Sequence, residues 1–289
     1  MTPVGVMRRR RRSVLFVPGA NLRAIEKARG LPADVVILDI EDSVADGQKA
    51  QARRNAVEAI SSGAFAAGEV LLRINPVGSL DFAADMEAAR GAAGIVLPKV
   101  ESVEHLAAAA PAGLPLWAML ETPRAVLQAG SIAAAAGHLP LAALIVGPND
   151  LIRTTGISPG QDRQYLLPWL MQVVLAGKAF GLTVLDGVYN AFRDEAGFVR
   201  ECAQAAQMGF DGKTLIHPSQ VQPANDAFRP GASDIAWAKA VVAAFAAPDA
   251  AQSNVLSIDG AMVERLHLPM AEAILREAGQ AMSLPDDLA

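Results

Sequence analysis

VVILD, residues 35–39, decides the fold, because four apolar residues lead directly into a carboxylate. The pattern of an apolar run ending in a polar residue occurs seven times, at Asp39, Arg73, Lys99, Glu121, Asp150, Asp186 and His217. Consecutive members lie 22 to 36 residues apart, and a parallel strand with its return helix needs about 30 residues. The repeat predicts a barrel that carries its functional groups at one end of the strands.

Eight strands are expected in this repeat, and they are apolar throughout rather than alternating, as is typical of strands buried on both faces. We expect them at residues 13–17, 35–40, 69–74, 94–99, 115–120, 141–147, 183–186 and 212–217. No G-x-G-x-x-G follows the first strand and no Walker sequence occurs, so the signals of nucleotide-binding folds are absent. We therefore predict a TIM-type (β/α)8 barrel over residues 13–230 rather than an open doubly wound sheet.

The two ends of the chain fall outside the repeat. IAWAKAVVAAFAA and MAEAILREAGQAM have helical periodicity, which predicts a helical C-terminal extension over residues 231–289, serving as a lid or a subunit contact. Residues 1–12 form a basic N-terminal arm that contains Arg8 to Arg12. The arm is either solvated, or its last arginines border the first strand and help to hold a polyanionic ligand.

Composition limits the class of protein. Of the 289 residues, 52% are hydrophobic, so a large core can be buried. The apolar stretches are interrupted before the roughly 18 residues that a membrane span needs, so we expect no membrane association. A net charge of -5 argues against a nucleic-acid partner. The single cysteine, Cys202, cannot form an internal disulfide, which favours the cytoplasm.

Glu121 and Asp150 are the sharpest pair of candidate ligands. They end neighbouring strands of the predicted barrel, so both carboxylates can point into one space. Two protein carboxylates, completed by water and substrate, are a common way to bind Mg²⁺. No H-E-x-x-H or Cys/His cluster suggests zinc. The alternative is that the pair serves as helix caps or ion-pair partners.

Arg73 ends the third strand, where a guanidinium is costly to bury without a partner and suits a carboxylate. The partner is either substrate or internal, for example Asp39 or Glu41. Asp39, Glu41 and Asp42 form an acidic cluster that needs neutralising by cations such as Arg73, Lys99 or a metal. We expect mixed roles here, with Asp42 structural as a cap of the next helix.

Lys99 is a candidate for binding a substrate carboxylate or for forming a Schiff base. Carboxylates nearby would keep it protonated, which disfavours the Schiff base. We assign Asp186 and His217 to support or structure, and Cys202 to the core of a helical run.

The order of motifs resembles a known family. LFVPG, VVILDIEDSVA, LLRIN, VLPKVES, AMLET, VGPNDL, LDGVY and GFDGKTLIHPSQV resemble the citrate lyase β-subunit-like branch of the HpcH/HpaI aldolase superfamily, which includes malyl-CoA and citramalyl-CoA lyases. The resemblance runs from about residue 13 to 275. It implies a Mg²⁺-dependent barrel enzyme that cleaves CoA thioesters of 3-hydroxy acids into an acyl-CoA and an oxo-acid, assembled as a homotrimer or hexamer.

The resemblance also assigns roles to residues. Glu121 and Asp150 match the family's Mg²⁺ ligands, and Arg73 matches the arginine that grips the oxo-acid. Asp39, Glu41 and Asp42 match the acidic motif that supports metal and substrate. Candidate catalytic groups are then Arg73, Asp39 and Glu264, while Arg73, Glu121, Glu41 and Lys99 contact substrate.

Two departures from the family pattern matter. GPND and Ile216-His217-Pro218 look more like stand-alone paralogues than the subunit of the citrate lyase complex. The family's G-x-M-I/V-D motif reads Gly260-Ala261-Met262-Val263-Glu264, with Glu where Asp is usual. In malyl- and citramalyl-CoA lyases that Asp is an acid/base group from a neighbouring subunit, and proton transfer is sensitive to placement. A malyl-CoA-type thioesterase and a non-catalytic metal-binding subunit of a lyase complex remain alternatives to the lyase.

Overall fold

The computed structural model describes residues 10–247, 250 and 253–279 and divides the chain into two compact units. The first unit ends at Phe228 and the second begins at Arg229. Within the described residues, no helix combines the length and the apolar character that a bilayer crossing requires.

Eight parallel strands close into a barrel in chain order, with β1 hydrogen-bonded to both β2 and β8. They are β1 (Ser13–Pro18), β2 (Val35–Asp39), β3 (Glu69–Arg73), β4 (Ile95–Leu97), β5 (Leu116–Leu120), β6 (Leu141–Val146), β7 (Thr183–Asp186) and β8 (Gly212–Leu215). The predicted TIM-type barrel is confirmed, and each observed strand overlaps a predicted one.

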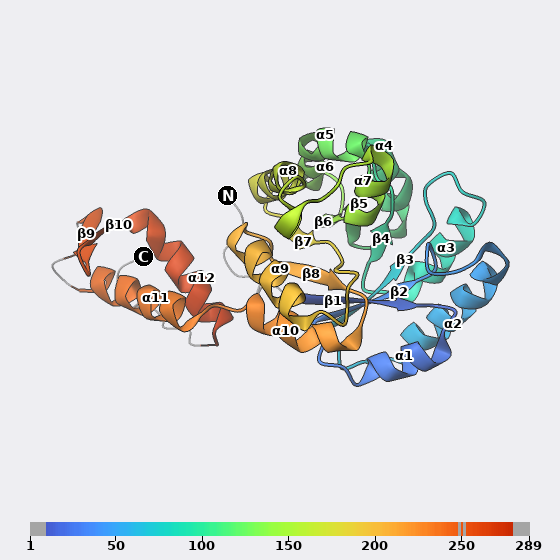
Figure 1. Ribbon diagram of the computed structural model, residues 1–289, viewed down its shortest axis with the longest axis horizontal. Helices are drawn as coiled ribbons and strands as arrows, with labels where there is room; N and C mark the ends of the chain where they lie inside the picture. The colour runs from blue at the N-terminus through green and yellow to red at the C-terminus, as the bar shows by residue number, and fades with distance from the viewer. Residues whose placement is uncertain (1–9, 248–249, 251–252, 280–289) are drawn as a thin grey trace. The chain divides into compact units, whose positions relative to one another are not determined.

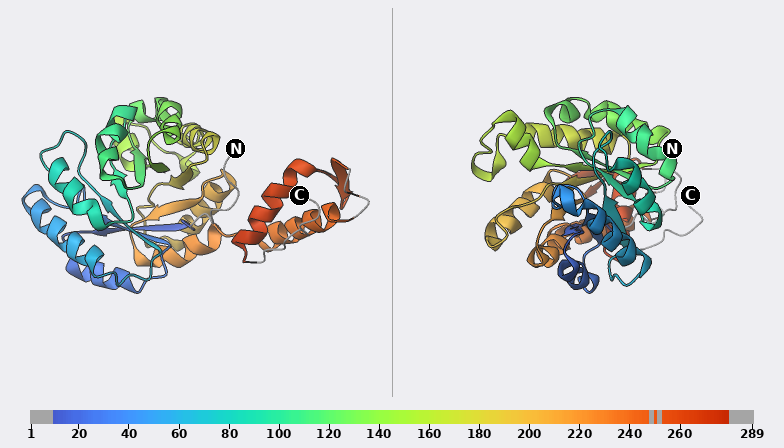
Figure 2. Two further views of the ribbon diagram at one scale, coloured as in Figure 1. Left: turned by 180° about the vertical axis from the view of Figure 1, so that it is seen from behind. Right: turned by 90° about the vertical axis from the view of Figure 1, so that its right-hand side faces the viewer.

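Helices surround the strands of the first unit (Figure 1, Figure 2). They are α1 (Leu22–Arg29), α2 (Lys49–Ser61), α3 (Phe82–Ala88), α4 (Val103–Ala109), α5 (Pro123–Leu127), α6 (Ala129–Ala134), α7 (Pro148–Thr155), α8 (Leu167–Ala179), α9 (Glu195–Gln207) and α10 (Val221–Ala227). Their apolar faces pack on the outward side chains of the strands in one large core.

Strand alternation decides which side chains reach the barrel axis. The interior cluster holds Ile37, Leu71 and Trp117, among others, whereas their sequence neighbours pack outward against the helices. Because side chains alternate along a strand, residues two further on also face inward. Asp39 follows Ile37 and Arg73 follows Leu71 in this way, so both lie at the inner rim of the barrel.

Arg11 lies at the opposite, N-terminal end of the strands. Its guanidinium donates to both carboxylate oxygens of Glu69 at 2.9 and 3.0 Å and to Thr183 Oγ1 at 3.2 Å, and it stacks 4.5 Å from the Trp117 ring. Arg12 similarly pairs with Asp34. These two arginines therefore bind the barrel at the end opposite the polar residues Asp39, Arg73, Glu121 and Asp150. Arg8 and Arg9 lie outside the described residues.

The second unit contains α11 (Ala232–Phe245), β9 (Val255–Ile258), β10 (Ala261–Glu264) and α12 (Leu268–Glu277) around a small core of its own. The two predicted C-terminal helices are confirmed as α11 and α12, and the segment between them forms an antiparallel hairpin. Asp259 and Gly260 form its turn with φ of 50° and 79°, the geometry that an Asp-Gly pair favours.

Candidate active site

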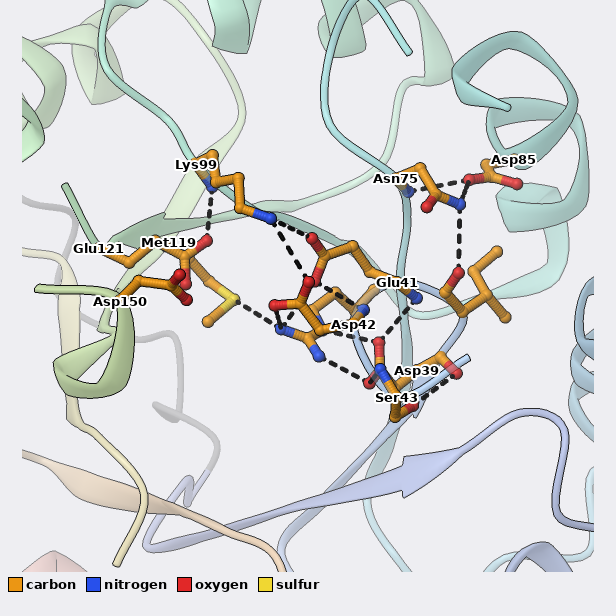
Figure 3. Close-up of polar contacts among 12 residues, drawn as sticks. Asp39, Glu41, Asp42, Ser43, Asn75, Asp85, Lys99, Met119, Glu121 and Asp150 are labelled. Atoms are coloured by element: carbon orange, nitrogen blue, oxygen red, sulfur yellow. Dashed lines mark hydrogen bonds and ion pairs between the residues drawn. The ribbon is translucent and has the colours of Figure 1, made fainter. Parts of the chain in front are cut away.

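The strand ends surround a cavity of about 330 Å³, and Figure 3 draws several of its lining residues as sticks. Four predicted site residues line it, namely Asp39, Arg73, Glu121 and Asp150. The other lining residues are Phe16, Pro18, Asp42, Ser43, Met119, Val146, Gly147, Pro148, Asn149, Val188, Thr214 and Ile216. The cavity thus joins one arginine and several carboxylates to an apolar wall.

Asp39 and Arg73 form a buried, bidentate ion pair across β2 and β3. Arg73 Nε lies 2.7 Å from Oδ1 of Asp39, and Nη2 lies 2.6 Å from Oδ2. Burial alone would raise the pKa of Asp39, but the attraction of Arg73 outweighs it and holds the pKa below its usual value. The remaining amino edge of Arg73 approaches Met119 Sδ at 3.9 Å and Glu41 at 3.2 Å. Of the two partners expected for Arg73, the structure shows the internal one.

Glu41 and Lys99 lie beside this pair without lining the cavity. Lys99 Nζ contacts Glu41 Oε1 at 2.6 Å and Asp42 Oδ1 at 3.5 Å. Burial opposes a charged ammonium, but the contact with Glu41 prevails and raises the pKa of Lys99. A lysine that stays protonated is a poor Schiff-base nucleophile, which agrees with the sequence argument. Asp42 is half-exposed and pairs with these cations, while α2 is preceded by Gln48, so Asp42 does not cap that helix as expected.

Glu121 is buried at the end of β5, with 1% of its surface exposed. Its Oε1 accepts a 2.7 Å hydrogen bond from the backbone N–H of Lys99, which adopts a left-handed φ of 53°. Burial, reinforced by repulsion from Asp150, raises the pKa of Glu121 to about 7. A Cβ at Gly147 would lie 2.6 Å from Glu121 Oε2, so only glycine leaves room for this carboxylate.

Asp150 lies in the first turn of α7, which begins at Pro148 after Gly147. The partial positive charge of a helix N-terminus favours a carboxylate there, and Arg153 one turn later forms an ion pair with it. Figure 3 shows the carboxyl groups of Asp150 and Glu121 facing the same space. Two hard oxygen donors that face one space suit Mg²⁺, with water and substrate completing its ligands. Within the described residues, no group of three or more acidic, His or Cys side chains forms a richer metal site.

Asp186 and His217 do not join the cavity. Asp186 faces outward because Leu185 before it faces the barrel axis, and it pairs with Lys213 at 2.6 Å and with Arg163 at 2.7 Å. His217 caps the turn after β8 and stacks on Phe192 with ring centroids 4.7 Å apart. Both residues have structural partners, as the sequence suggested, and Cys202 is buried in α9.

Glu264 belongs to the second unit, at the end of β10. Its backbone N–H donates to His267 Nδ1 at 2.9 Å, at the start of the short helical turn over Arg265–His267. This contact uses the backbone of Glu264, and the catalytic role of its carboxyl group stays a prediction.

The polar residues that end the apolar runs do not reveal the apolar wall of the cavity. Phe16 lies two residues after the inward-facing Val14, and Met119 lies two residues after Trp117. Inward alternation along β1 and β5 is therefore the signal that would have found both residues. Phe16 also stacks on the Arg73 guanidinium, 4.8 Å from the ring centre.

Residues 12–218 match the sequence model of the HpcH/HpaI aldolase/citrate lyase family. The chain belongs to this family. Among its relatives, a (3S)-malyl-CoA thioesterase of Cereibacter sphaeroides is 42% identical over 272 residues, which cover 92% of this chain and 94% of the relative. A citrate lyase subunit beta-like protein of Mycobacterium tuberculosis is 36% identical over 93% of this chain and 96% of the relative.

A solved structure of this HpcH/HpaI-family group supports the same assignment. The crystal structure of CitE from Mycobacterium tuberculosis in complex with magnesium, acetoacetate and coenzyme A has a TM-score of 0.78 and 34% identity, and it covers 92% of this chain and 97% of that one. A citrate lyase beta subunit from the same organism, complexed with oxaloacetate and magnesium, has a TM-score of 0.67 and 35% identity over 75% of this chain and 96% of that one.

Proposed function

We propose that this protein is a Mg²⁺-dependent carbon–carbon lyase that cleaves a 3-hydroxyacyl-CoA, such as malyl-, citramalyl- or citryl-CoA, into an acyl-CoA and an oxo-acid. The observation that carries the proposal is the cavity that joins the Glu121 and Asp150 carboxylates to Arg73. Relatives whose crystal structures contain magnesium with oxaloacetate, or with acetoacetate and coenzyme A, support it.

Glu121 and Asp150 are the residues proposed to hold Mg²⁺. Their carboxylates face one space, and a divalent cation would neutralise the repulsion that helps to raise the pKa of Glu121. When bound, Mg²⁺ supplies Lewis-acid stabilisation of negative charge on oxygen.

Arg73 is the residue proposed to bind the carboxylate of the oxo-acid portion. Asp39 fixes its Nε and one amino group, and the other amino group, which lies 3.2 Å from Glu41, is the one proposed to contact the substrate carboxylate. A donor held in place before reaction stabilises developing charge without reorganisation. Beside Arg73, the carboxylate of Glu41 forms ion pairs with both Arg73 and Lys99.

The reaction requires one proton to move at each end. The 3-hydroxyl gives up its proton, the carbon–carbon bond breaks to form the oxo-acid, and its electron pair passes to the acyl-CoA carbon, which is then protonated. Glu264 is the proposed acid/base group for these transfers, acting in the site of another subunit of a homotrimer or hexamer.

Thioester hydrolysis is the second candidate, and one specific observation favours it. The relative that is 42% identical over 92% of this chain is named a (3S)-malyl-CoA thioesterase. Hydrolysis would use the same metal and Arg73 but would release free CoA. A non-catalytic subunit of a lyase complex is a third possibility, which activity of the purified chain alone would exclude.

One assay separates these functions. The purified protein is incubated with Mg²⁺ and malyl-, citramalyl- or citryl-CoA, and oxo-acid, acyl-CoA and free CoA are followed in parallel. Equal oxo-acid and acyl-CoA indicates the lyase, whereas free CoA without oxo-acid indicates the hydrolase. Glu121→Ala and Asp150→Ala should each abolish the Mg²⁺-dependent rate, and retention of that rate by either variant would refute the metal assignment.

A further inference from the structure

Lys49 is a buried lysine with an unusual set of partners. It begins α2, and only 8% of its surface is exposed. Its ammonium group donates to the backbone carbonyl of Glu41 at 2.7 Å, to that of Ile40 at 3.2 Å and to Asn75 Oδ1 at 2.8 Å. These three acceptors use all three ammonium donors, and none is a carboxylate. Burial of a charge is costly unless it is hydrogen-bonded, and here the hydrogen bonds to two main-chain carbonyls and to Asn75 offset that cost.

Those carbonyls belong to the segment that carries the acidic cluster, residues 39–43, which we call the acidic turn. The backbone N–H of Glu41 donates to Asp39 Oδ1 at 2.9 Å, and that of Asp42 donates to Glu41 Oε2 at 2.8 Å. Ser43 N–H lies 3.3 Å from Asp39 Oδ2. Lys49 therefore binds backbone carbonyls of the acidic turn, and backbone amides of the same turn orient the carboxylates of Asp39 and Glu41 beside Arg73.

Asn75 extends this support to the neighbouring strand. Its amide nitrogen donates to the Ile40 carbonyl at 3.1 Å. It also donates to Asp85 Oδ2 at 2.7 Å, and Figure 3 shows Asn75 beside Asp85. Asp85 is fully buried and is itself bound by Arg53 at 2.7 Å. Asn75 lies two residues after Arg73, so one network joins the ends of β2 and β3.

We propose that Lys49 is a positioning residue, which holds the acidic turn so that Asp39 and Glu41 orient Arg73 for the oxo-acid. Lys49 touches neither the cavity nor the proposed metal ligands, so its effect on the site passes through the turn. The role of Arg73 in this inference rests on the proposed function, whereas the support of the acidic turn by Lys49 rests on the hydrogen bonds alone.

Lys49→Met tests this by two binding measurements on the full chain. Mg²⁺ affinity and the affinity for oxaloacetate at saturating Mg²⁺ are each measured by calorimetry. We expect oxaloacetate affinity to fall about 10- to 100-fold, because small displacements of a positioned group are costly. Mg²⁺ affinity should stay at the wild-type value, since Glu121 and Asp150 keep their contacts. A purely structural role would lower both affinities together or neither, and either result would overturn the proposal.

Hydrogen exchange supplies a readout that needs no ligand. The amides of residues 41–43 should exchange faster in Lys49→Met, because their carboxylate acceptors lose a fixed geometry. If wild-type protein binds no oxo-acid, the proposed function fails, whereas unchanged exchange at these amides defeats the Lys49 proposal separately.

Lys213→Met is the matched control, because Lys213 is also a buried lysine but pairs with Asp186 and Glu201 on the outer side of β8. It should lower stability while leaving oxaloacetate affinity unchanged. If Lys49→Met does not fold, Asn75→Ala removes one Lys49 partner and should show the same selective loss of oxaloacetate affinity at smaller amplitude. Wild-type oxaloacetate affinity in folded Asn75→Ala would then overturn the proposal.

Discussion

Lys99 combines a strained backbone with two contacts of different kinds. Its φ of 53° lies in the left-handed region, its N–H binds Glu121 and its ammonium binds Glu41. Lys99→Ala and Lys99→Gly both remove the ammonium, but only glycine relieves the strain. We expect Lys99→Gly to be more stable than Lys99→Ala by about 1 kcal/mol, as measured by urea unfolding. Equal stability would mean that the surrounding loop, rather than φ, determines the cost.

Glu121 predicts a pH dependence of stability in the metal-free protein. Its pKa rises from 4.5 to about 7 on folding, chiefly through burial. The folded state therefore holds this proton more tightly, so the contribution is complete below pH 4.5 and is lost as pH rises through about 7. The size of the shift corresponds to a loss on the order of 3 kcal/mol.

Urea unfolding in a chelating buffer from pH 4.5 to 8 measures this effect. The neutral side chain of Glu121→Gln is the reference, so the wild type should lose stability relative to the variant over this range. Saturating Mg²⁺ should reverse the loss, because the cation binds the ionised carboxylate. Parallel pH profiles for the two proteins would contradict the raised pKa.

For single residues, the sequence predicted the polar side chains that line the cavity but not the residues that hold them in place. Asp39, Arg73, Glu121 and Asp150 were found because each ends an apolar run at the same edge of the barrel. Lys49 was hidden, because a lysine at the start of an amphipathic helix normally lies in solvent. Its burial depends on the carbonyls of a separate strand end, which no local pattern reveals.

Among the elements, the strands are coupled at the N-terminal end of the barrel through Arg11. It contacts β3 and β7 and stacks on Trp117 of β5. Arg11→Met should lower the free energy of unfolding by about 2–3 kcal/mol, since it breaks a largely buried ion pair with Glu69. Mg²⁺ affinity should not change, because this pair lies at the end of the strands away from the cavity.

Thermal unfolding with parallel Mg²⁺ titration checks the Arg11 prediction. Arg11→Met combined with Glu69→Gln should recover part of the lost stability, because the second change removes the buried charge. A weakened Mg²⁺ affinity in Arg11→Met would instead indicate that the two ends of the barrel are coupled.

Element boundaries were predictable where apolar runs are long and both faces are buried, as in β2 and β5. The hairpin of β9 and β10 was missed because its strands have only four residues each. The Asp259-Gly260 pair between them was the available signal.

For the whole molecule, the proposed acid/base role of Glu264 in another subunit's site leads to a prediction about mixed oligomers. Its unit has a separate core, formed by residues such as Val242, Phe245 and Leu275. If Glu264 acts in another subunit's site, a Glu121→Ala chain and a Glu264→Ala chain are each inactive but carry complementary halves. Mixed oligomers would then contain some complete sites.

Mixing the two inactive variants after reversible dissociation tests this arrangement. In a ring where each site combines two neighbouring chains, random assembly from equal amounts should restore about a quarter of the wild-type rate. Each variant taken through dissociation alone provides the control and should stay inactive. Exchange of chains must be verified with differently tagged subunits, so that a lack of activity is informative. Verified mixed oligomers without activity would show that Glu264 and Glu121 do not form a site across chains.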